Sequence, residues 1–265
     1  MILVCGHYCH DLLIAKDGAE TPALGGSASY AAAVLDGFGE PYRVAAKAGP
    51  DFGYAAQLTH PPRIVAAPTT SFVDDYRADE RHERVQAVCE PLEPGDLPPG
   101  PFDVGLAFGV AGEVTLPVLE RLRSICRIVL ADAQSLLRSV AADGGILLRA
   151  ADPSALAQLD WIKASRTEAA FLDVPRLRTR LGIIVTDGTR GCTLFTASGE
   201  LHVAATPAVE VDPTGAGDCF LTGFAIGLRR GFSPERAAAL GSWCGARAVE
   251  QAGVPRLFAT EPFPV

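Results

Sequence analysis

Residues 212–218 (Asp-Pro-Thr-Gly-Ala-Gly-Asp) lie directly before an apolar run with helical spacing. The apolar residues of that run are Phe220, Leu221, Phe224, Ala225 and Leu228. This periodicity predicts a helix that begins near Gly215, Ala216 and Gly217. Small residues leave the first backbone amides of a helix open, and these amides and the helix dipole attract an anion. The segment therefore predicts a phosphate-binding site.

Asp218 is expected in the first turn of this helix, beside the bound phosphate. A carboxylate in that place can take the proton of an attacking hydroxyl, while the neighbouring amides stabilise charge on the transferring phosphoryl group. A short Gly-x-Gly-Asp alone is more often an ordinary turn with a helix-favouring acid. The longer string is far more specific, so phosphoryl transfer with Asp218 as general base is our interpretation.

The string resembles the C-terminal signature of the ribokinase-like carbohydrate and purine kinases. Residues 25–30 (Gly-Gly-Ser-Ala-Ser-Tyr) are similar to the family's N-terminal Gly-Gly signature, and residues 49–53 (Gly-Pro-Asp-Phe-Gly) to the turn that follows it. The resemblance spans nearly the whole chain. It implies an ATP-dependent kinase in which Asp218 is the catalytic base and residues 215–217 form the anion hole.

The resemblance also implies which residues bind ATP, the phosphoryl donor, and its metal ions. Residues 165–168 (Ser-Arg-Thr-Glu) are similar to the family's Asn-x-x-Glu motif, which makes Glu168 the residue that organises Mg²⁺ and its waters, with Ser165 in place of the usual Asn. Asp212 and Thr214 match positions that support a monovalent cation, K⁺, in some members. Residues 186–191 resemble the nucleotide-side turn, although a plain turn between two strands is the alternative. The implied ATP-binding residues are Ser165, Thr186, Gly188, Gly191 and Thr214.

On the acceptor side the resemblance implies a pocket for a small polyol or sugar. Its residues are Asp11, Gly25, Gly26, Ser27 and Tyr30, and Tyr30 stands where many sugar kinases carry Asn. Short polar groups with few aromatic platforms favour a compact polyol over a nucleoside. Residues 6–11, 25–30, 69–76 and 132–134 together most resemble the myo-inositol kinases of plants. A sugar or nucleoside kinase, or a catalytically weak regulatory member, are the alternatives.

Four possible soft metal ligands lie close together near the N-terminus, at Cys5, His7, Cys9 and His10. A zinc site would use such residues, but their spacing lacks the paired knuckles of structural zinc sites. Buried cysteines commonly pack as small apolar residues. We therefore expect core packing and no zinc.

Composition excludes several other classes of function. The 265 residues carry a net charge of −8, so no cationic surface is expected for nucleic acid or for a membrane. The 7 scattered cysteines do not form a disulfide framework, and the N-terminal apolar run lacks the features of a signal peptide. A cytoplasmic enzyme is expected.

The elements that must position these residues indicate an α/β fold. Strand-like and helix-like segments alternate from residue 102 onward, which predicts a doubly wound, mostly parallel sheet with helices on both faces. Alternating polar and apolar residues at about 69–92, with a break at 78–82, predict a two-stranded ribbon. Together with the hairpin expected at about 12–24, it would form a small β lid on a single domain of residues 1–265. Its exposed edge could also pair between two subunits in a homodimer.

Overall fold

The computed structural model describes residues 1–78 and 82–255. Its main body is an eight-stranded sheet in the order β16-β15-β14-β13-β10-β9-β1-β4. These strands are β1 (Ile2–Cys5), β4 (Tyr42–Ala45), β9 (Phe102–Ala107), β10 (Cys126–Asp132), β13 (Trp161–Ser165), β14 (Gly182–Thr186), β15 (Cys192–Thr196) and β16 (Gly199–Val203). All neighbouring pairs are parallel except β14 with β15 and β15 with β16.

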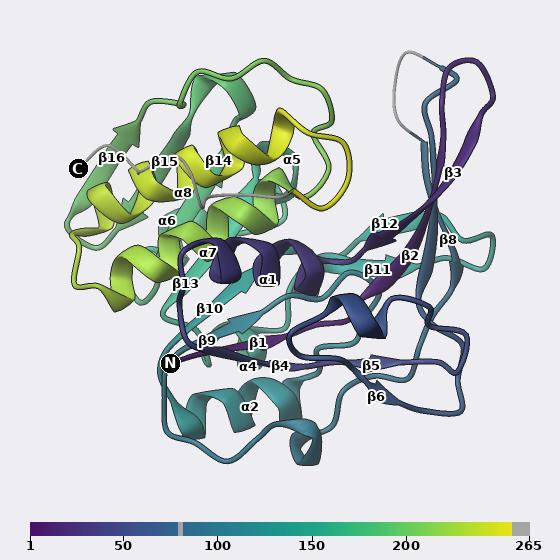
Figure 1. The fold of residues 1–265 in the computed structure, drawn as a ribbon. Helices are drawn as coiled ribbons and strands as arrows, with labels where there is room; N and C mark the ends of the chain where they lie inside the picture. Colours follow the sequence, from purple (N-terminus) through teal and green to yellow (C-terminus); the bar gives the residue numbers. More distant parts are fainter. Residues whose placement is uncertain (79–81, 256–265) are drawn as a thin grey trace.

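Helices cover both faces of this sheet (Figure 1). The helices are α1 (Ser27–Gly37), α2 (Leu116–Ile125), α3 (Gln134–Leu137), α4 (Pro153–Leu156), α5 (Arg166–Ala169), α6 (Val174–Leu177), α7 (Ala216–Arg229) and α8 (Pro234–Val249). Helices α1, α7 and α8 share one apolar cluster with Ile2 and Val4, whereas helices α2 and α4 share another with Leu3 and Cys5. Because successive side chains of β1 enter opposite clusters, the strand is buried on both sides, as expected for an interior strand of a parallel sheet. The predicted doubly wound α/β fold is confirmed.

A second sheet of four strands extends from the body as an arm, in the order β3-β2-β7-β8 (Figure 1). It consists of β2 (Cys9–Ile14), β3 (Glu20–Gly25), β7 (Ser71–Asp75) and β8 (His82–Ala87). Strand β2 pairs in parallel with β7, so the two segments predicted to form the lid belong to one sheet. Residues 79–81, within the expected break at 78–82, lie outside the described residues.

Several elements differ from the sequence expectation. The helix expected from about residue 167 is only α5, which ends at Ala169, and the strand expected at 44–48 is divided into β4 and β5 (Lys47–Ala48). A hairpin of β11 (Arg138–Val140) and β12 (Ile146–Leu148) was not predicted, because its short strands lack a clear alternation. The short remaining elements are β6 (Arg63–Ile64), η1 (Ala55–Gln57), η2 (Pro94–Asp96) and η3 (Gly188–Arg190). Within residues 1–78 and 82–255, no helix has the length and apolarity needed to cross a bilayer.

Candidate active site

A cavity of about 300 Å³ lies where the second sheet meets the carboxyl ends of β10, β13 and β14. Open α/β sheets commonly bind ligands at this edge. The lining residues from the body are Gly26, Ser27, Tyr30, Val110, Asp132, Gln134, Arg138, Lys163, Ser165, Glu168, Thr186, Pro213, Thr214, Gly215, Gly217 and Asp218. Those from the second sheet are Asp11, Phe72, Asp74 and Glu83.

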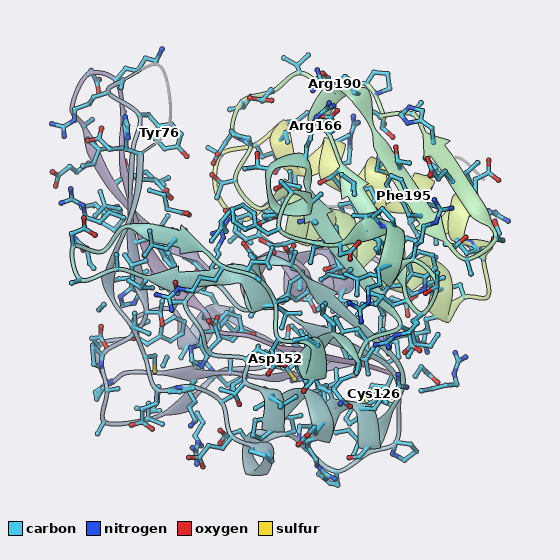
Figure 2. All side chains as sticks on the ribbon, turned by 180° about the vertical axis from the view of Figure 1, so that it is seen from behind. Tyr76, Cys126, Asp152, Arg166, Arg190 and Phe195 are labelled. Atoms are coloured by element: carbon cyan, nitrogen blue, oxygen red, sulfur yellow. The ribbon has the colours of Figure 1, made fainter. Side chains whose placement is uncertain are left out.

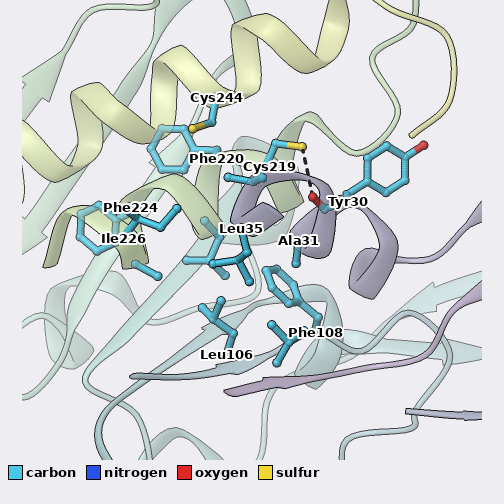
Figure 3. Packing of buried hydrophobic residues seen from close by; sticks show 14 of the residues in the cluster. Tyr30, Ala31, Leu35, Leu106, Phe108, Cys219, Phe220, Phe224, Ile226 and Cys244 are labelled. Carbon is cyan, nitrogen blue, oxygen red and sulfur yellow. Dashed lines mark hydrogen bonds between the residues drawn. The ribbon is translucent and has the colours of Figure 1, made fainter. Parts of the chain in front are cut away.

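The start of α7 forms one wall of the cavity. Gly215 is the N-cap residue and has a left-handed backbone (φ 74°). A Cβ atom on Gly215 would lie 2.0 Å from the ring of Tyr30, so glycine is needed both for the conformation and for the close packing. Behind this turn, Cys219 and Phe220 enter the core, and Tyr30 of α1 belongs to the same apolar cluster (Figure 3). The packing therefore fixes the first turn of α7 against α1.

Asp218 lies in this first turn and faces the cavity, as the sequence predicted. Its Oδ1 accepts a hydrogen bond from Nε2 of Gln134 at 3.4 Å, and the same amide donates to Oγ of Ser27 at 3.1 Å. Burial, and next the charge of Asp132, raise the pKa of Asp218 to about 7, while Lys163 acts in the opposite direction. A carboxyl group that titrates near neutral pH is well suited to act as a general base.

Lys163 and Asp132 form an ion pair beside Asp218 that the sequence analysis did not assign. Nζ of Lys163 lies 2.5 Å from Oδ2 of Asp132, and the two side chains are 7% and 2% exposed. Burial alone would lower the pKa of Lys163, but the surrounding carboxylates, first that of Asp132, raise it. A signal was available, because a lysine in an otherwise apolar central strand is expected to be buried and to need a partner.

Glu168 is buried at the start of α5 and lines the cavity. Its Oε2 accepts hydrogen bonds from the backbone N and the Oγ of Ser165, at 2.9 and 2.8 Å, in a capping box. Its Oε1 lies 3.8 Å from Nε of Arg138, whose Nη1 also contacts Glu83 of β8 at 3.4 Å. Burial would raise the pKa of Glu168, but Lys163 and the bonds from Ser165 lower it, so the carboxylate stays ionised.

Asp212 and Thr214 hold the loop that precedes α7. Oδ1 of Asp212 accepts from the backbone N of Thr214 at 2.9 Å, and its Oδ2 accepts from the backbone N of Gly253 at 3.1 Å. The hydroxyl of Tyr76, which follows β7, contacts Oγ1 of Thr214 at 3.1 Å. Thr214 lines the cavity and Asp212 does not, so the described contacts give Asp212 a role in fixing the loop.

The residues expected to bind the acceptor come from distant segments. Asp11 of β2 is 8% exposed, and a Cβ atom on Gly25 would lie 1.8 Å from its Oδ2. Gly25 is therefore needed to make room for this carboxylate, although it does not line the cavity itself, whereas Gly26, Ser27 and Tyr30 do. Phe72, Asp74, Val110 and Gln134 also line the cavity, and the sequence analysis assigned no site role to them individually.

Most of the expected nucleotide-side turn lies outside the cavity. Thr186 lines the cavity, but Gly188, Gly191 and Ala216 do not. Gly188 and Gly191 have positive φ angles of 54° and 84°; Gly188 is the first residue of η3 and Gly191 follows its last, between β14 and β15. Figure 2 shows Arg166 and Arg190 close together on the same edge of the body, where both contact Asp187 at 2.7 Å.

The residues at the phosphoryl end fit a magnesium ion held mainly through water and phosphate. Mg²⁺ in kinase sites commonly uses one or two carboxylates together with substrate phosphates. The carboxylates of Glu168 and Asp218 face the cavity, and no group of at least 3 His, Cys, Asp or Glu residues within 1–78 and 82–255 forms a direct cage for a metal. In the described part of the chain, Cys5, His7, Cys9 and His10 do not belong to a group of three or more residues placed to hold a metal ion.

Comparison with known proteins agrees with this geometry. Residues 147–258 match the pfkB family of carbohydrate kinases. The chain is 44% identical over 276 residues to inositol 3-kinase of Zea mays, with 96% of this chain and 73% of that protein covered. It is 46% identical over 275 residues to inositol 3-kinase of Oryza sativa subsp. japonica, with 96% and 69% covered.

Solved structures share the fold at low identity. A pyrophosphate-dependent kinase in the ribokinase family, solved with a pyrophosphate analog and myo-inositol, has a TM-score of 0.82 at 20% identity, covering 97% of this chain and 98% of that one. Ribokinase of Thermotoga maritima has a TM-score of 0.72 at 19% identity, with 97% and 96% covered. The sequence matches and the shared fold confirm the resemblance: this chain belongs to the pfkB family of carbohydrate kinases.

Proposed function

We propose that this protein is an ATP-dependent kinase that transfers the terminal phosphoryl group to a hydroxyl of myo-inositol. The observation that carries the proposal is the position of Asp218, at the start of α7 and on the wall of a cavity that Asp11 and Asp74 also line. Ring hydroxyls are hydrogen-bond donors, and carboxylates accept them. The inositol 3-kinases of maize and rice support this choice of acceptor.

The geometry supports a direct, in-line transfer. The acceptor hydroxyl gives its proton to the carboxylate of Asp218 as its oxygen forms a bond to the terminal phosphorus. The bond from that phosphorus to the bridging oxygen breaks, and ADP leaves. The amides of residues 215–217 stabilise the charge that spreads over the phosphoryl oxygens. Gln134, which contacts both Asp218 and Ser27, orients the carboxylate toward the acceptor.

We further propose Mg²⁺ as the metal, with Glu168 as the residue that orders its waters. When bound, Mg²⁺ neutralises negative charge on the phosphates. A requirement for K⁺ is a weaker proposal, because both oxygens of Asp212 already accept backbone hydrogen bonds. Turnover with K⁺ replaced by a large organic cation tests it, and unchanged turnover would remove K⁺ from the account.

The experiment that tests the function is a two-way screen of acceptors and donors. The purified protein is incubated with Mg²⁺ and ATP or pyrophosphate, and with myo-inositol, ribose, fructose or a nucleoside, and the products are resolved by ³¹P NMR. Pyrophosphate belongs in the screen because it serves the structural neighbour that also binds myo-inositol. We expect ATP and myo-inositol to give the largest kcat/KM. Strong turnover of another acceptor with none of myo-inositol would remove the substrate assignment, and no turnover at all would favour a regulatory protein.

Three further expectations are also proposals. Closure of the second sheet over the bound acceptor would exclude water from the reaction, and the contact of Tyr76 with Thr214 would hold the sheet against the body.

A homodimer through the exposed strands of this sheet is testable by light scattering. The free, buried state of Cys5, Cys9, Cys89, Cys126, Cys192, Cys219 and Cys244 supports a cytoplasmic location.

A further inference from the structure

The strongest unassigned feature of the cavity is the buried pair of Lys163 and Asp132. These residues are partners across the parallel strands β13 and β10, so their side chains leave the sheet on the same face near its carboxyl edge. That face is the one covered by α7, because Trp161, two residues before Lys163, packs edge-on against Phe224 at 5.0 Å. The sheet register therefore directs the ammonium group toward the start of α7.

The ammonium group lies directly against the first turn of that helix. A Cβ atom on Gly217 would lie 2.4 Å from Nζ of Lys163, and 4.0 Å from Oδ2 of Asp132. Because Gly217 has no side chain, the ammonium group of Lys163 can lie beside the backbone amides of residues 215–217. Lys163, Gly215, Gly217 and Asp218 all line the same cavity. An anion held by the amides of residues 215–217 would contact this ammonium group.

A purely structural ion pair does not explain this position. Taking two charges out of water costs several kcal/mol per ion, and such pairs are weak evidence for stability. The same chain contains a buried pair away from the cavity, in which Nζ of Lys47 lies 3.1 Å from Oδ2 of Asp96 and the side chains are 2% and 7% exposed. Lys47 also donates to the carbonyl of Pro91 at 2.7 Å and does not line the cavity, as expected of a lysine with a structural role. Lys163 differs because it lines the cavity.

We infer that Lys163 is a catalytic residue that binds the transferring phosphoryl group, and that Asp132 is the positioning residue that holds its ammonium group in the anion hole. The inference rests on the proposed phosphoryl transfer and extends it. An ammonium group has three protons, so it can donate to Asp132 and to phosphoryl oxygens together. Hydrogen bonds between ions are roughly twice as strong as neutral ones, and they strengthen as charge develops on the phosphoryl oxygens.

The test compares Lys163→Met with Lys47→Met, the matched change in the second buried pair. We expect Lys163→Met to lower kcat for ATP and myo-inositol by about 100-fold or more, the usual loss for one charge-stabilising donor, while KM for myo-inositol stays within about threefold. Lys47→Met is expected to lower the thermal midpoint but to keep kcat within about threefold for the folded protein. Equal kcat values in wild type and Lys163→Met would overturn the inference.

A double variant separates lost charge from lost folding. Asp132→Asn with Lys163→Met replaces the ion pair by a neutral pair of similar volume, which cores commonly tolerate. We expect this protein to fold and to keep the loss in kcat, because the cation is still missing. Recovery of wild-type kcat in the double variant would show that the pair is only structural and would refute the inference.

A binding measurement keeps this inference distinct from the proposed function. Titration calorimetry of MgATP, and separately of pyrophosphate, needs no acceptor and no turnover. We expect roughly tenfold weaker binding to Lys163→Met than to wild type, about one lost charged hydrogen bond. Wild type that binds these anions but phosphorylates no polyol would contradict the function and not the role of Lys163. Equal anion affinity in wild type and Lys163→Met, with equal kcat, would contradict the role of Lys163.

Discussion

The two ends of the cavity are built in different ways. The phosphoryl end is formed largely by a contiguous turn, in which Gly215, Gly217 and Asp218 lie within the first residues of a long, packed helix. The acceptor end is assembled from separate segments, with Asp11 and Phe72 on the second sheet and Val110 on a loop of the body. In the proposed reaction, the chemistry thus rests on a packed helix, whereas the choice of acceptor depends on how the second sheet is placed against the body.

Polar contacts link the second sheet to the start of α7 and to α5. Among the described residues they include Tyr76 with Thr214, and Arg138 with both Glu83 and Glu168. Arg138 therefore joins a strand of the second sheet to the residue proposed to organise the metal. Because the two ends of the cavity are built differently, we predict that substitutions at the start of α7 reduce kcat, while substitutions on the second sheet mainly raise KM for the acceptor.

The largest effect is expected for Asp218→Asn. Asparagine keeps the shape but cannot take the proton, so kcat should fall by about 1,000-fold, within the usual range for general-base catalysis, while calorimetry shows ATP affinity within about threefold. Asp160→Asn, at a partly exposed ion pair with Arg123 outside the cavity, is the control and should keep kcat. A kcat for Asp218→Asn within tenfold of wild type would show that another group accepts the proton.

The same variant has a stability signature. The pKa of Asp218 is raised in the folded protein to about 7, above its value in the unfolded chain. Ionisation of this group therefore costs stability, and the cost develops as the pH rises from about 4 to about 7. Asp218→Asn should have a higher thermal midpoint than wild type at pH 8 and little advantage at pH 4. An equal midpoint at pH 8 would contradict the raised pKa.

A smaller loss is expected for Gly217→Ala. The added methyl group would lie 2.4 Å from Nζ of Lys163, so the lysine must leave the anion hole. We expect kcat to fall by about 100-fold, the loss for one charge-stabilising donor, with little change in the thermal midpoint. Gly223→Ala, in the same helix but against Sγ of Cys244, is the control and should lower the midpoint while sparing kcat. A lower thermal midpoint with unchanged kcat for Gly217→Ala would show that Gly217 serves packing alone.

Asp11→Asn tests the acceptor end. Loss of the charge should weaken a hydrogen bond to a ring hydroxyl, and KM for myo-inositol should rise by about tenfold, in line with about 1.5 kcal/mol for a hydrogen bond to a charged group. Asp17→Asn, on the exposed turn of the same sheet where Asp17 accepts from the backbone N of Ala19, should leave KM unchanged. A fall in kcat without a change in KM would show that the two ends of the cavity are not separate in function.

The smallest expected effect is a shift in pH dependence. The log of kcat/KM in wild type should rise with pH and level off near pH 7, where Asp218 becomes ionised. Asp132 raises this pKa, while Lys163 and Arg138 lower it. Asp132→Asn should therefore move the acidic limb to lower pH by about one unit or less. A limb that stays in place would show that Asp132 does not act on the base.

Much of the body could be predicted because its signals are local. Small residues followed by an apolar helical period place the start of α7, and the first turn then fixes Asp218 without any knowledge of the rest of the fold. Alternating elements likewise indicate a parallel sheet. Residues that depend on register were missed, since Lys163 meets Asp132 only because β13 and β10 are neighbours with that alignment. Arg138 was missed for the same reason, because its hairpin has little periodicity and its partners come from β8 and α5.

Of the ATP-binding and metal-binding residues that the family resemblance implied, some line the cavity and others do not. Ser165, Thr186, Glu168 and Thr214 do line the cavity. Gly188 and Gly191 lie outside it, because the η3 turn continues past the carboxyl edge of β14 before the chain returns along β15. A motif thus locates a turn in the chain, but the reach of that turn toward a ligand is set by strand length and pairing.

The most direct measurement of the central claim is a crystal structure with myo-inositol and a non-hydrolysable ATP analogue. We predict that a carboxylate oxygen of Asp218 lies within about 3.2 Å of one ring hydroxyl, the reach of a general base, and that this hydroxyl oxygen is in line with the terminal phosphorus. A bound acceptor whose nearest hydroxyl is far from Asp218, or a terminal phosphate outside the amides of residues 215–217, would contradict the account.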